Sequence, residues 1–238
     1  MSQILVTKEN WPKKKEEIGP LLKAMRFAVA VTGAGISKAS GIPLFKERID
    51  GIPLQQFFKS EFLNSDPVHY YRLYRRILAQ WRRAKPNAAH WALSKRGIWV
   101  VTQNIDGLHR DAGTRHLIEL HGNLRELQCP TCKQVYQSDL AFAAKVPVCP
   151  DCDGLLMPGV TLEGQQIRHF SRAVDWCGRA QVLFVVGSKL NMEPVRQLPE
   201  IAESNGAVVV FINQDAEHAL PGLLEEHPRP TKGRTADV

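Results

Sequence analysis

Five short apolar stretches along the chain are typical of strands that a sheet buries on both faces. They are rich in Val, Ile and Phe, and each ends close to a Gly, Asn or Thr, where chains commonly turn. Helical patterns separate several of them, and this alternation predicts an α/β fold with a Rossmann-like, doubly wound parallel sheet. The predicted strands are 26–32, 97–102, 116–120, 182–187 and 207–212.

Residues 66–84 have the periodicity of an amphipathic helix. Large apolar side chains recur on one face, at Val68, Tyr71, Tyr74, Leu78 and Trp81. Arginines occupy much of the remaining surface, at Arg72, Arg75, Arg76, Arg82 and Arg83. Basic helix faces are commonly solvated, so we interpret this face as exposed surface, with contact to an acidic partner as the alternative.

Residues 124–158 interrupt the alternation of strands and helices. They hold four cysteines, several turn residues and one short helical candidate near 138–144. We interpret them as a small inserted module, which divides a Rossmann-like domain into residues 1–123 and 159–225. Residues 226–238 contain Pro, Gly and charge without apolar periodicity, and we expect them to form a mobile tail.

The composition is that of an ordinary globular protein. Of 238 residues, 44% are hydrophobic and 23% charged, which excludes a fibrous or disordered chain. The net charge of +7 favours acidic ligands but is too small to predict nucleic acid as a partner. The longest apolar runs are far shorter than the ~18 residues of a membrane span, and no secretory signal pattern is visible. We therefore expect a cytoplasmic protein without a membrane segment.

Two CxxC pairs lie in the inserted module. Cys129 and Cys132 form the first pair, Cys149 and Cys152 the second, and sixteen residues separate them. Two tight turns at this spacing can present four thiolates tetrahedrally, which indicates one bound Zn²⁺. A redox CxxC needs a single pair beside a strand and a helix start, so it is the weaker reading. Four thiolates leave no open position for water, so we expect a structural metal and predict that the chemistry lies elsewhere.

A glycine-rich turn follows the first long apolar stretch. Gly33 and Gly35 would allow a tight turn and let backbone amides approach a pyrophosphate, which favours a dinucleotide crevice. An ordinary turn is the alternative. The G-x-G-x-x-G fingerprint of dehydrogenases is not met, because Lys38 stands at its third glycine, so hydride transfer is disfavoured.

Several further motifs share the order and spacing of one known family. Together with the glycine turn and the CxxC pairs, they resemble the sirtuins from about residue 26 to 215. The resemblance implies NAD-dependent removal of acyl groups from protein lysines, with release of nicotinamide and O-acyl-ADP-ribose. The motifs are GAGIS (33–37), SGIP (40–43), PNAAH (86–90), TQNIDGLH (102–109), HG (121–122), VVGSKL (185–190) and INQD (212–215).

The resemblance also implies roles for single residues. His121 matches the general base, a task that suits an imidazole with a pKa near 6.5, and Asn104 and Asp106 match the other catalytic positions. Asp106 could also cap a helix that begins near Gly107. His90, His109 and His116 are expected to support structure. The matched NAD-binding positions are Gly33, Ala34, Gly35, Ile42, Phe45, Gln103, Asn104, Ile105, Asp106, Gly187, Ser188, Asn213 and Asp215, and the matched acyl-lysine substrate positions are Val160, Glu163 and Gly164.

Several positions depart from the sirtuin pattern. Leu44 and Lys46 flank Phe45 where the family commonly has Asp and Arg, and lysine lacks the planar fork of guanidinium. Lys189 adds a cation after Gly187 and Ser188 and could face a phosphate. The chain also lacks the tyrosine and arginine three residues apart that suit acidic acyl chains in some sirtuins, because Tyr71 and Arg75 are four apart.

The departure that bears most on substrate choice is Glu163, which stands where the family has a phenylalanine. A carboxylate buried without a partner in an apolar lysine tunnel costs several kcal/mol. Either Glu163 points outward or the substrate is unusual. A protein-lysine deacylase is therefore the first interpretation. An NAD-consuming ADP-ribosyltransferase or NAD hydrolase, or a weakly active NAD-binding protein, are the alternatives.

Overall fold

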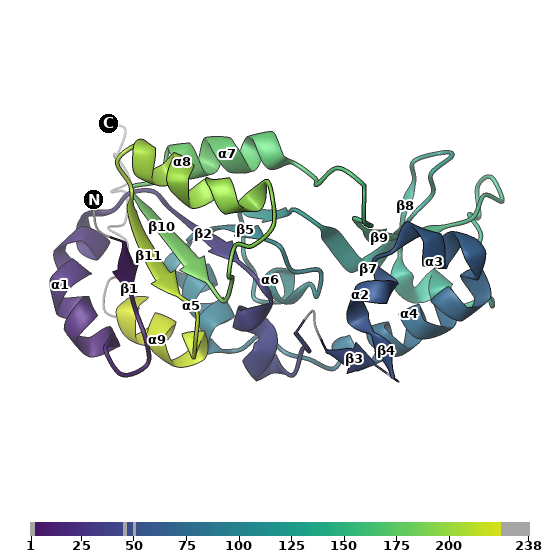
Figure 1. Ribbon diagram of the computed structural model, residues 1–238, viewed down its shortest axis with the longest axis horizontal. Helices are drawn as coiled ribbons and strands as arrows, with labels where there is room; N and C mark the ends of the chain where they lie inside the picture. The colour runs from purple at the N-terminus through teal and green to yellow at the C-terminus, as the bar shows by residue number, and fades with distance from the viewer. Residues whose placement is uncertain (1–2, 45–46, 50, 225–238) are drawn as a thin grey trace, which may run out of the picture.

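The computed structural model describes residues 3–44, 47–49 and 51–224. Figure 1 shows two lobes side by side along the long axis, a large one around a twisted sheet and a smaller one that holds β7, β8 and β9. The predicted tail 226–238, Phe45 and Lys46 lie outside the described residues.

A six-stranded sheet forms the centre of the large lobe. Its order is β1-β11-β10-β2-β5-β6, and all neighbouring strands are parallel. Strands β5 and β6 lie on one side of β2, and the late strands β10 and β11 lie on the other, so the connections reverse direction between β2 and β10. The strands are β1 (Ile4–Leu5), β2 (Ala28–Thr32), β5 (Trp99–Thr102), β6 (Leu117–Glu119), β10 (Val182–Val186) and β11 (Val208–Ile212).

Each of the five predicted strands overlaps an observed one, so the predicted parallel α/β sheet is confirmed. Every residue of β2 and β10 is buried, which explains their unbroken apolar runs. Strand β1 was not predicted, because two residues are too short to show a pattern.

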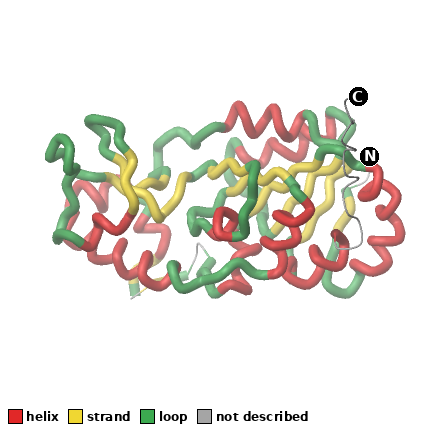
Figure 2. Tube along the Cα trace, turned by 180° about the vertical axis from the view of Figure 1, so that it is seen from behind, coloured by secondary structure: helices red, strands yellow, loops and turns green. Residues whose placement is uncertain are grey.

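Helices cover both faces of this sheet, as the doubly wound arrangement requires (Figure 2). On one face α1 (Trp11–Ala24), α5 (Ala88–Arg96) and α9 (Ala216–Leu224) bury Leu22, Leu93 and Leu220 against the strands. On the other face α7 (Phe170–Gly178) and α8 (Leu198–Ser204) bury Trp176 and Leu198.

The small lobe has its own sheet and its own core. Strands β7 (Gly122–Gln128), β8 (Val135–Gln137) and β9 (Met157–Val160) form an antiparallel sheet in the order β8-β7-β9. Three helices share one apolar core with it: α2 (Leu54–Phe57), α3 (Ser60–Ser65) and α4 (Pro67–Trp81). The predicted inserted module, 124–158, thus packs with an earlier segment that holds α2, α3 and α4. Its boundaries along the chain stay a prediction.

Helix α4 confirms the predicted helix at 66–84, but it packs on the small lobe and not on the parallel sheet. Its apolar face is wider than the predicted stripe, since Tyr70, Leu73 and Ile77 are also buried. Val68 was assigned to that stripe wrongly, because it is 49% exposed.

The prediction of a solvated arginine face on α4 is wrong for two arginines. Arg75 donates to three backbone carbonyls of the small lobe, at Ala141, Ala144 and Lys145. Arg82 pairs with Asp139 at 2.8 Å. Sequence periodicity cannot distinguish an arginine that faces water from one that faces backbone acceptors of a neighbouring segment.

Short elements complete the described chain. They are η1 (Ala34–Ser40), β3 (Arg48–Ile49), β4 (Ile52–Pro53), α6 (Leu108–Asp111), η2 (Ser138–Phe142) and η3 (Val195–Gln197). The 3₁₀ helix η2 confirms the helical candidate at 138–144. Within the described ranges, every helix is too short or too polar to cross a membrane.

Candidate functional site

Two glycine turns meet at the carboxyl edge of the sheet, where the chain reverses direction between β2 and β10. A Cβ placed on Gly33 would lie 2.8 Å from Cβ of Ser188, and one on Gly35 would lie 2.7 Å from Cα of Gly187. Real Cβ atoms do not approach so closely, and Gly187 also has a φ of 60°, which other residues rarely adopt. The glycines are therefore required for the two turns to touch.

The amides of these glycines are used inside the protein. Gly33 N donates to Val186 O at 3.0 Å, and Gly35 N donates to Gly187 O at 2.8 Å. Ala34 stands at the first position of η1, where a backbone N–H has no acceptor within its own helix. Of the three predicted turn residues, Ala34 thus offers the amide best suited to an anionic group such as a pyrophosphate.

The loop that follows β5 presents the amide and carboxylate side chains. Gln103 donates from Nε2 to Ser188 Oγ at 2.8 Å, which ties the loop to the second glycine turn. Asn104 and Asp106 are both buried, and both contact Ser37: Asn104 Nδ2 donates to Ser37 Oγ at 3.1 Å, and Ser37 Oγ donates to Asp106 Oδ2 at 2.7 Å. One hydroxyl therefore fixes both predicted catalytic side chains.

Asp106 also serves the helix that follows it. Its Oδ1 accepts from Leu108 N at 2.8 Å, at the start of α6, although the N-cap position itself is taken by Gly107 and not by Asp106 as predicted. Burial raises the pKa of Asp106, while the hydrogen bonds from Leu108 and Ser37 and the charge of Arg125 act against that rise. These contacts favour the carboxylate form, which can only accept hydrogen bonds.

His121 lies between β6 and β7, close to the loop. Its Nδ1 is 2.9 Å from the carbonyl oxygen of Gln103. A carbonyl can only accept, so Nδ1 carries the proton and Nε2 keeps its lone pair. Burial lowers the pKa of His121, against a smaller opposing effect of the Gln103 contact. The imidazole is therefore neutral near pH 7, with a basic nitrogen available.

Two further histidines are buried beneath the loop. His90 Nδ1 accepts from Asn87 N at 3.3 Å, so its Nε2 carries the proton and donates to Ser37 Oγ at 3.4 Å. Burial lowers the pKa of His90 to about 4. His109 Nε2 lies 3.0 Å from Thr32 Oγ1, and burial lowers the pKa of His109 well below its ordinary value. Both are neutral and support the loop from inside the protein.

The predicted substrate segment begins beside His121. Val160 ends β9 and pairs with Gly122, and Thr161 N then donates to His121 O at 2.8 Å. Gly164 is exposed with a φ of 83°, which makes it the turn of the segment. The structure thus brings Val160 and His121 to the same edge of the small sheet.

Glu163 points outward, which answers the alternative left open by the sequence. Its side chain is exposed, whereas the preceding Leu162 is 3% exposed and lies in the small-lobe core. The backbone is held by the small lobe, because Glu163 N donates to Phe58 O at 2.8 Å and Ser60 Oγ donates to Glu163 O at 3.3 Å. The carboxylate therefore remains hydrated.

Tyr71 and Arg75 have structural roles. The Tyr71 hydroxyl donates to Leu156 O, and the Arg75 guanidinium is occupied by the carbonyls of 141, 144 and 145. Both side chains therefore make contacts within the small lobe. This agrees with the sequence, which gave no support for succinyl or malonyl preference.

The remaining predicted positions are more dispersed. Ile42 and Ile105 are buried in the small-lobe core. Asn213 and Asp215 follow β11, whose last residue Ile212 accepts from Gly187 N at 2.9 Å, and their side chains are exposed. Their predicted contact with the adenosine half of NAD stays a prediction.

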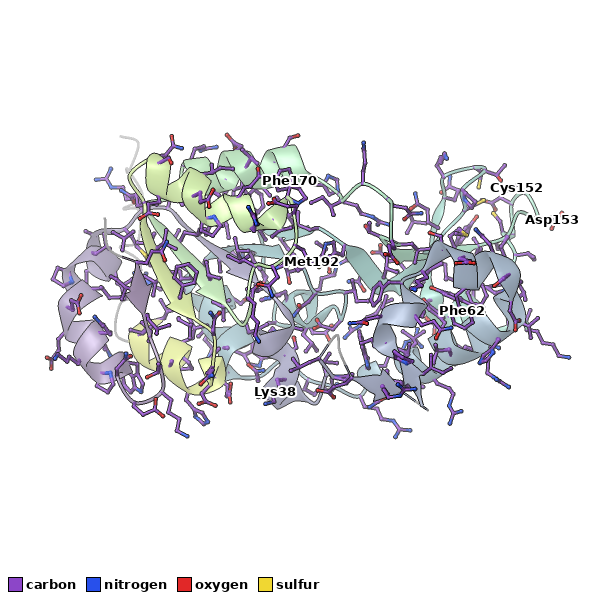
Figure 3. All side chains as sticks on the ribbon, in the orientation of Figure 1. Lys38, Phe62, Cys152, Asp153, Phe170 and Met192 are labelled. Atoms are coloured by element: carbon purple, nitrogen blue, oxygen red, sulfur yellow. The ribbon has the colours of Figure 1, made fainter. Side chains whose placement is uncertain are left out.

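The four module cysteines come together at the end of the small lobe that lies away from the parallel sheet (Figure 3). Their sulfurs all lie within 4.8 Å of one another, with 3.5 Å between Cys129 and Cys152 and 3.6 Å between Cys132 and Cys149. Zn–S bonds of about 2.3 Å in a tetrahedron place sulfurs about 3.8 Å apart. The residues therefore fit one Zn²⁺.

Both CxxC pairs fold in the same way. Lys133 N donates to Cys129 O at 3.0 Å, and Asp153 N donates to Cys149 O at 2.9 Å. Lys133 and Asp153 have φ values of 65° and 56°, so each pair ends in the same left-handed turn. The fifth cysteine, Cys177, is buried elsewhere, and burial raises its pKa to about 12, which makes it a poor nucleophile.

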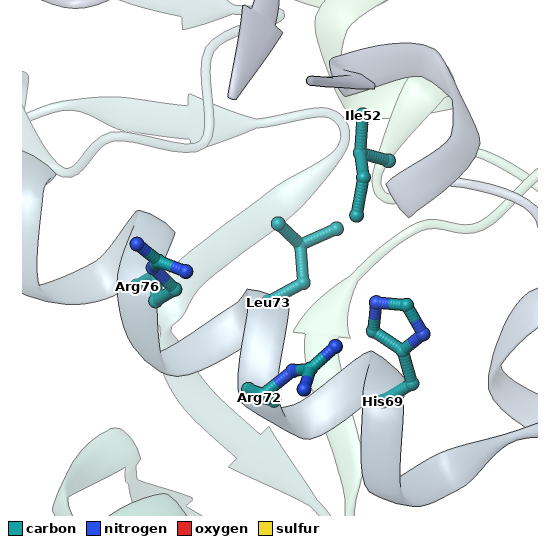
Figure 4. Close-up of a pocket in the computed structure, with 5 residues that line it drawn as sticks. All are labelled: Ile52, His69, Arg72, Leu73 and Arg76. Atoms are coloured by element: carbon teal, nitrogen blue, oxygen red, sulfur yellow. The ribbon is translucent and has the colours of Figure 1, made fainter. Parts of the chain in front are cut away.

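Two cavities lie outside the glycine turns and the polar loop. The first, of about 320 Å³, is basic and is lined by Ile52, His69, Arg72, Leu73 and Arg76 (Figure 4). The second, of about 660 Å³, lies just after the predicted substrate segment, between residues 165–172 and the Glu193–Pro194 turn.

Sequence reasoning quoted Ser37 within GAGIS but gave it no role, although it touches both Asn104 and Asp106. It also missed Arg125, which packs against the loop from β7. The signal for Ser37 was its place directly after the glycine turn. Arg125 gave no such signal, because its partners come from other segments.

Comparisons show which known proteins share this arrangement. A model of the Sir2 family matches residues 33–194. An NAD-dependent protein deacetylase of Caldivirga maquilingensis is 37% identical over 209 residues, which cover 81% of this chain and 80% of that protein. An NAD-dependent protein deacylase of Thermococcus sibiricus is 36% identical over 225 residues, which cover 87% and 88%.

Solved structures agree. Sir2Tm bound to a propionylated peptide has a TM-score of 0.79 with 32% identity, covering 90% of this chain and 98% of that one. A complex of Sir2 with a p53 peptide and NAD⁺ has a TM-score of 0.78 with 32% identity, covering 89% and 97%.

Proposed function

Because this chain belongs to the Sir2 family, we propose that it removes acyl groups from lysine side chains of proteins, consuming NAD and releasing nicotinamide and O-acyl-ADP-ribose. The observation that carries the proposal is the contact of His121 with the loop 103–107. A neutral imidazole with a free Nε2 lies against the segment that presents Asn104 and Asp106.

The residues at the sheet edge fit NAD. The Ala34 amide suits a pyrophosphate, and the buried Asp106 carboxylate would accept from the N–H groups of a carboxamide. When bound, NAD supplies the glycosidic bond whose cleavage activates the ribose. Asn104 would orient the ribose, and His121 Nε2 would take a proton from a ribose hydroxyl.

The substrate is then an acyl-lysine peptide that lies along Val160 to Gly164. Thr161, Leu162 and Glu163 donate their backbone N–H groups inside the protein, so pairing with an extended peptide would fall to other backbone groups of the segment, such as those of Gly164. The zinc site lacks an open position once four thiolates bind, so it would hold the small lobe together and take no part in the chemistry. We also propose a cytoplasmic location, because clustered thiolates bind metal most readily in a reducing compartment.

NAD hydrolysis or ADP-ribosyl transfer without acyl-lysine is the second candidate. The reason to consider it was the altered substrate segment, with Glu163 in place of phenylalanine. Because Glu163 points outward, most of that reason is removed. Thr161, in the substrate segment, donates to His121 O. The substrate segment therefore lies beside the proposed base, which favours peptide-dependent deacylation over NAD hydrolysis.

Nicotinamide release measured with and without an acetyl-lysine peptide tests this proposal. We expect release to require the peptide and to match the amount of deacetylated peptide formed, because both products come from one reaction. Equal release without peptide would instead favour NAD hydrolysis. Absence of release under both conditions, with NAD binding retained, would favour the weakly active NAD-binding protein.

Glu163 should bias the enzyme toward substrates with basic flanks. An exposed carboxylate beside the bound peptide attracts Lys or Arg and repels Asp or Glu, typically by less than 1 kcal/mol. At low ionic strength we expect kcat/KM to be about two- to fivefold higher for a basic than for an acidic flank. Glu163→Phe should abolish this difference.

Glu163→Gln is the matched control, since it removes the charge and keeps the size. It should lose the preference to the same extent as Glu163→Phe. A preference that survives in both variants, or that does not weaken when salt is added, would show that the charge of Glu163 is not its source.

A further inference from the structure

Strand β7 contacts the loop 103–107 along the whole length of that loop. At one end, His121, which directly precedes β7, bonds to Gln103 O. In the middle, Leu124 N donates to Ile105 O at 2.9 Å. At the other end, the Arg125 guanidinium packs against Gly107. Only the first and last of these contacts depend on side chains, so Arg125 is the side chain of β7 that supports the far end of the loop.

The contact between Arg125 and Gly107 is close. A Cβ placed on Gly107 would lie 2.9 Å from Arg125 Nε and 3.1 Å from Cζ, and Gly107 has a φ of 77°. The backbone conformation therefore favours glycine, and a side chain at this position would displace the guanidinium above it. The last residue of the loop is held between its own left-handed turn and this side chain.

Both the side chain and the backbone of Arg125 are held by hydrogen bonds. Its Nη1 and Nη2 donate to the two carboxylate oxygens of Asp111 in α6, each at 2.8 Å, which is the bidentate geometry that fixes a guanidinium plane. Its backbone N donates to Oδ1 of the fully buried Asn123 at 2.9 Å, and Asn123 Nδ2 donates to Glu119 at 2.7 Å. Arg125 thus joins β7, α6 and the loop between β5 and α6.

We propose that Arg125, locked by Asp111, is a positioning residue for the nicotinamide end of the NAD site. It fixes Gly107 and thereby the shape of the loop that presents Asn104 and Asp106. Its positive charge also acts on Asp106 without touching it. The inference rests on the proposed function for the identity of the ligand. It goes beyond it by assigning a role to an ion pair that lies outside the predicted site.

Because the Arg125–Asp111 ion pair lies beside the loop 103–107, we predict that its loss lowers the affinity for one ligand and not for another. The loop serves the nicotinamide half of NAD, whereas the glycine turns, on β2 and β10, are not contacted by Arg125. Loss of Arg125 should therefore weaken binding of NAD and leave binding of ADP-ribose, which lacks nicotinamide, nearly unchanged. A general loss of structure would weaken both.

Calorimetric titration of the full chain with NAD and with ADP-ribose tests this without relying on turnover. For Arg125→Ala we expect the Kd for NAD to rise about tenfold and the Kd for ADP-ribose to stay within about twofold. Arg125→Lys keeps the charge but loses the bidentate fork, so it should recover only part of the NAD affinity. Asp111→Ala should act in the same direction, and the double variant should be no worse than Arg125→Ala, because the two residues act as one unit.

Arg179→Ala is the matched control, since Arg179 also pairs with an aspartate, Asp175, but on the exposed surface of α7. It should bind both ligands as the parent does. Equal weakening of NAD and ADP-ribose in Arg125→Ala and in Asp111→Ala, or unchanged NAD affinity in both, would overturn the proposal. If Arg125→Ala does not fold, Asp111→Ala and Arg125→Lys decide the question. Peptide-dependent nicotinamide release by the parent protein tests the proposed function separately from these affinities.

Discussion

Replacement of His121 by alanine is expected to reduce deacylated product by about 10²- to 10⁴-fold, the usual contribution of a general base. The effect should be large because the structure leaves Nε2 as the basic atom, with Nδ1 committed to Gln103 O. Affinity for NAD should change little, since Gln103 keeps its bond to Ser188 and Arg125 still packs on Gly107, so both ends of the loop stay held. Product formation by mass spectrometry, together with calorimetric NAD binding, measures both effects.

The pH dependence of kcat/KM should also identify His121 as the general base. Burial lowers the pKa of His121, so the neutral base persists to lower pH than an ordinary imidazole near 6.5. In the parent, kcat/KM should therefore fall with acid through a midpoint below 6.5, and that limb should be lost in His121→Ala. His218→Ala, an exposed histidine on α9, is the control and should keep the parent profile. Normal deacylation by His121→Ala would refute the assignment.

Loss of the metal is expected to unfold the small lobe. Structural zinc sites in small peptides contribute on the order of 10 kcal/mol of folding free energy, and here Cys129 and Cys149 belong to the same core as α4 and β7. Cys132→Ala should therefore bind less zinc, melt at lower temperature and lose peptide-dependent nicotinamide release. Elemental analysis and thermal unfolding followed by circular dichroism measure the first two effects.

Cys177→Ala separates the metal from a general effect of losing a thiol. Cys177 lies on α7, buried in the core between that helix and the parallel sheet and outside the four-sulfur cluster, so its variant should keep one zinc per chain and peptide-dependent activity. Purification without chelator that yields a folded parent containing no zinc would rule out the structural-metal assignment.

Local sequence patterns predicted those parts of the fold that local physics determines. Strands such as 182–186 are buried on both faces, and their apolar runs identify them without knowledge of their neighbours. The CxxC pairs are similarly self-contained, because each forms one turn with its own hydrogen bond. The glycine turn was recognised from its place after a strand, but the reason for its glycines, contact with Gly187 and Ser188, is a tertiary one.

Features that depend on pairing between distant segments could not be predicted. The amphipathic pattern of 67–81 specifies a helix with one apolar face, but it does not say which sheet that face covers. The direction of Glu163 depends on bonds from Phe58 and Ser60, about one hundred residues earlier. Arg125 and Asp111 are likewise ordinary charged residues until the fold brings them together. The roles predicted for Asn213, Asp215 and Phe45 stay predictions.

Strand β7 runs from the residue after His121 to the residue before Cys129, so a single extended segment separates the base from the first metal ligand. Between these ends it carries Leu124 and Arg125, which contact the loop 103–107. The zinc module therefore cannot be removed without loss of contacts in the large lobe. A shortened chain that joined residue 123 to 159 would lose Leu124 and Arg125, and with them two of the contacts that hold the loop 103–107. We therefore expect deacylation to require both lobes.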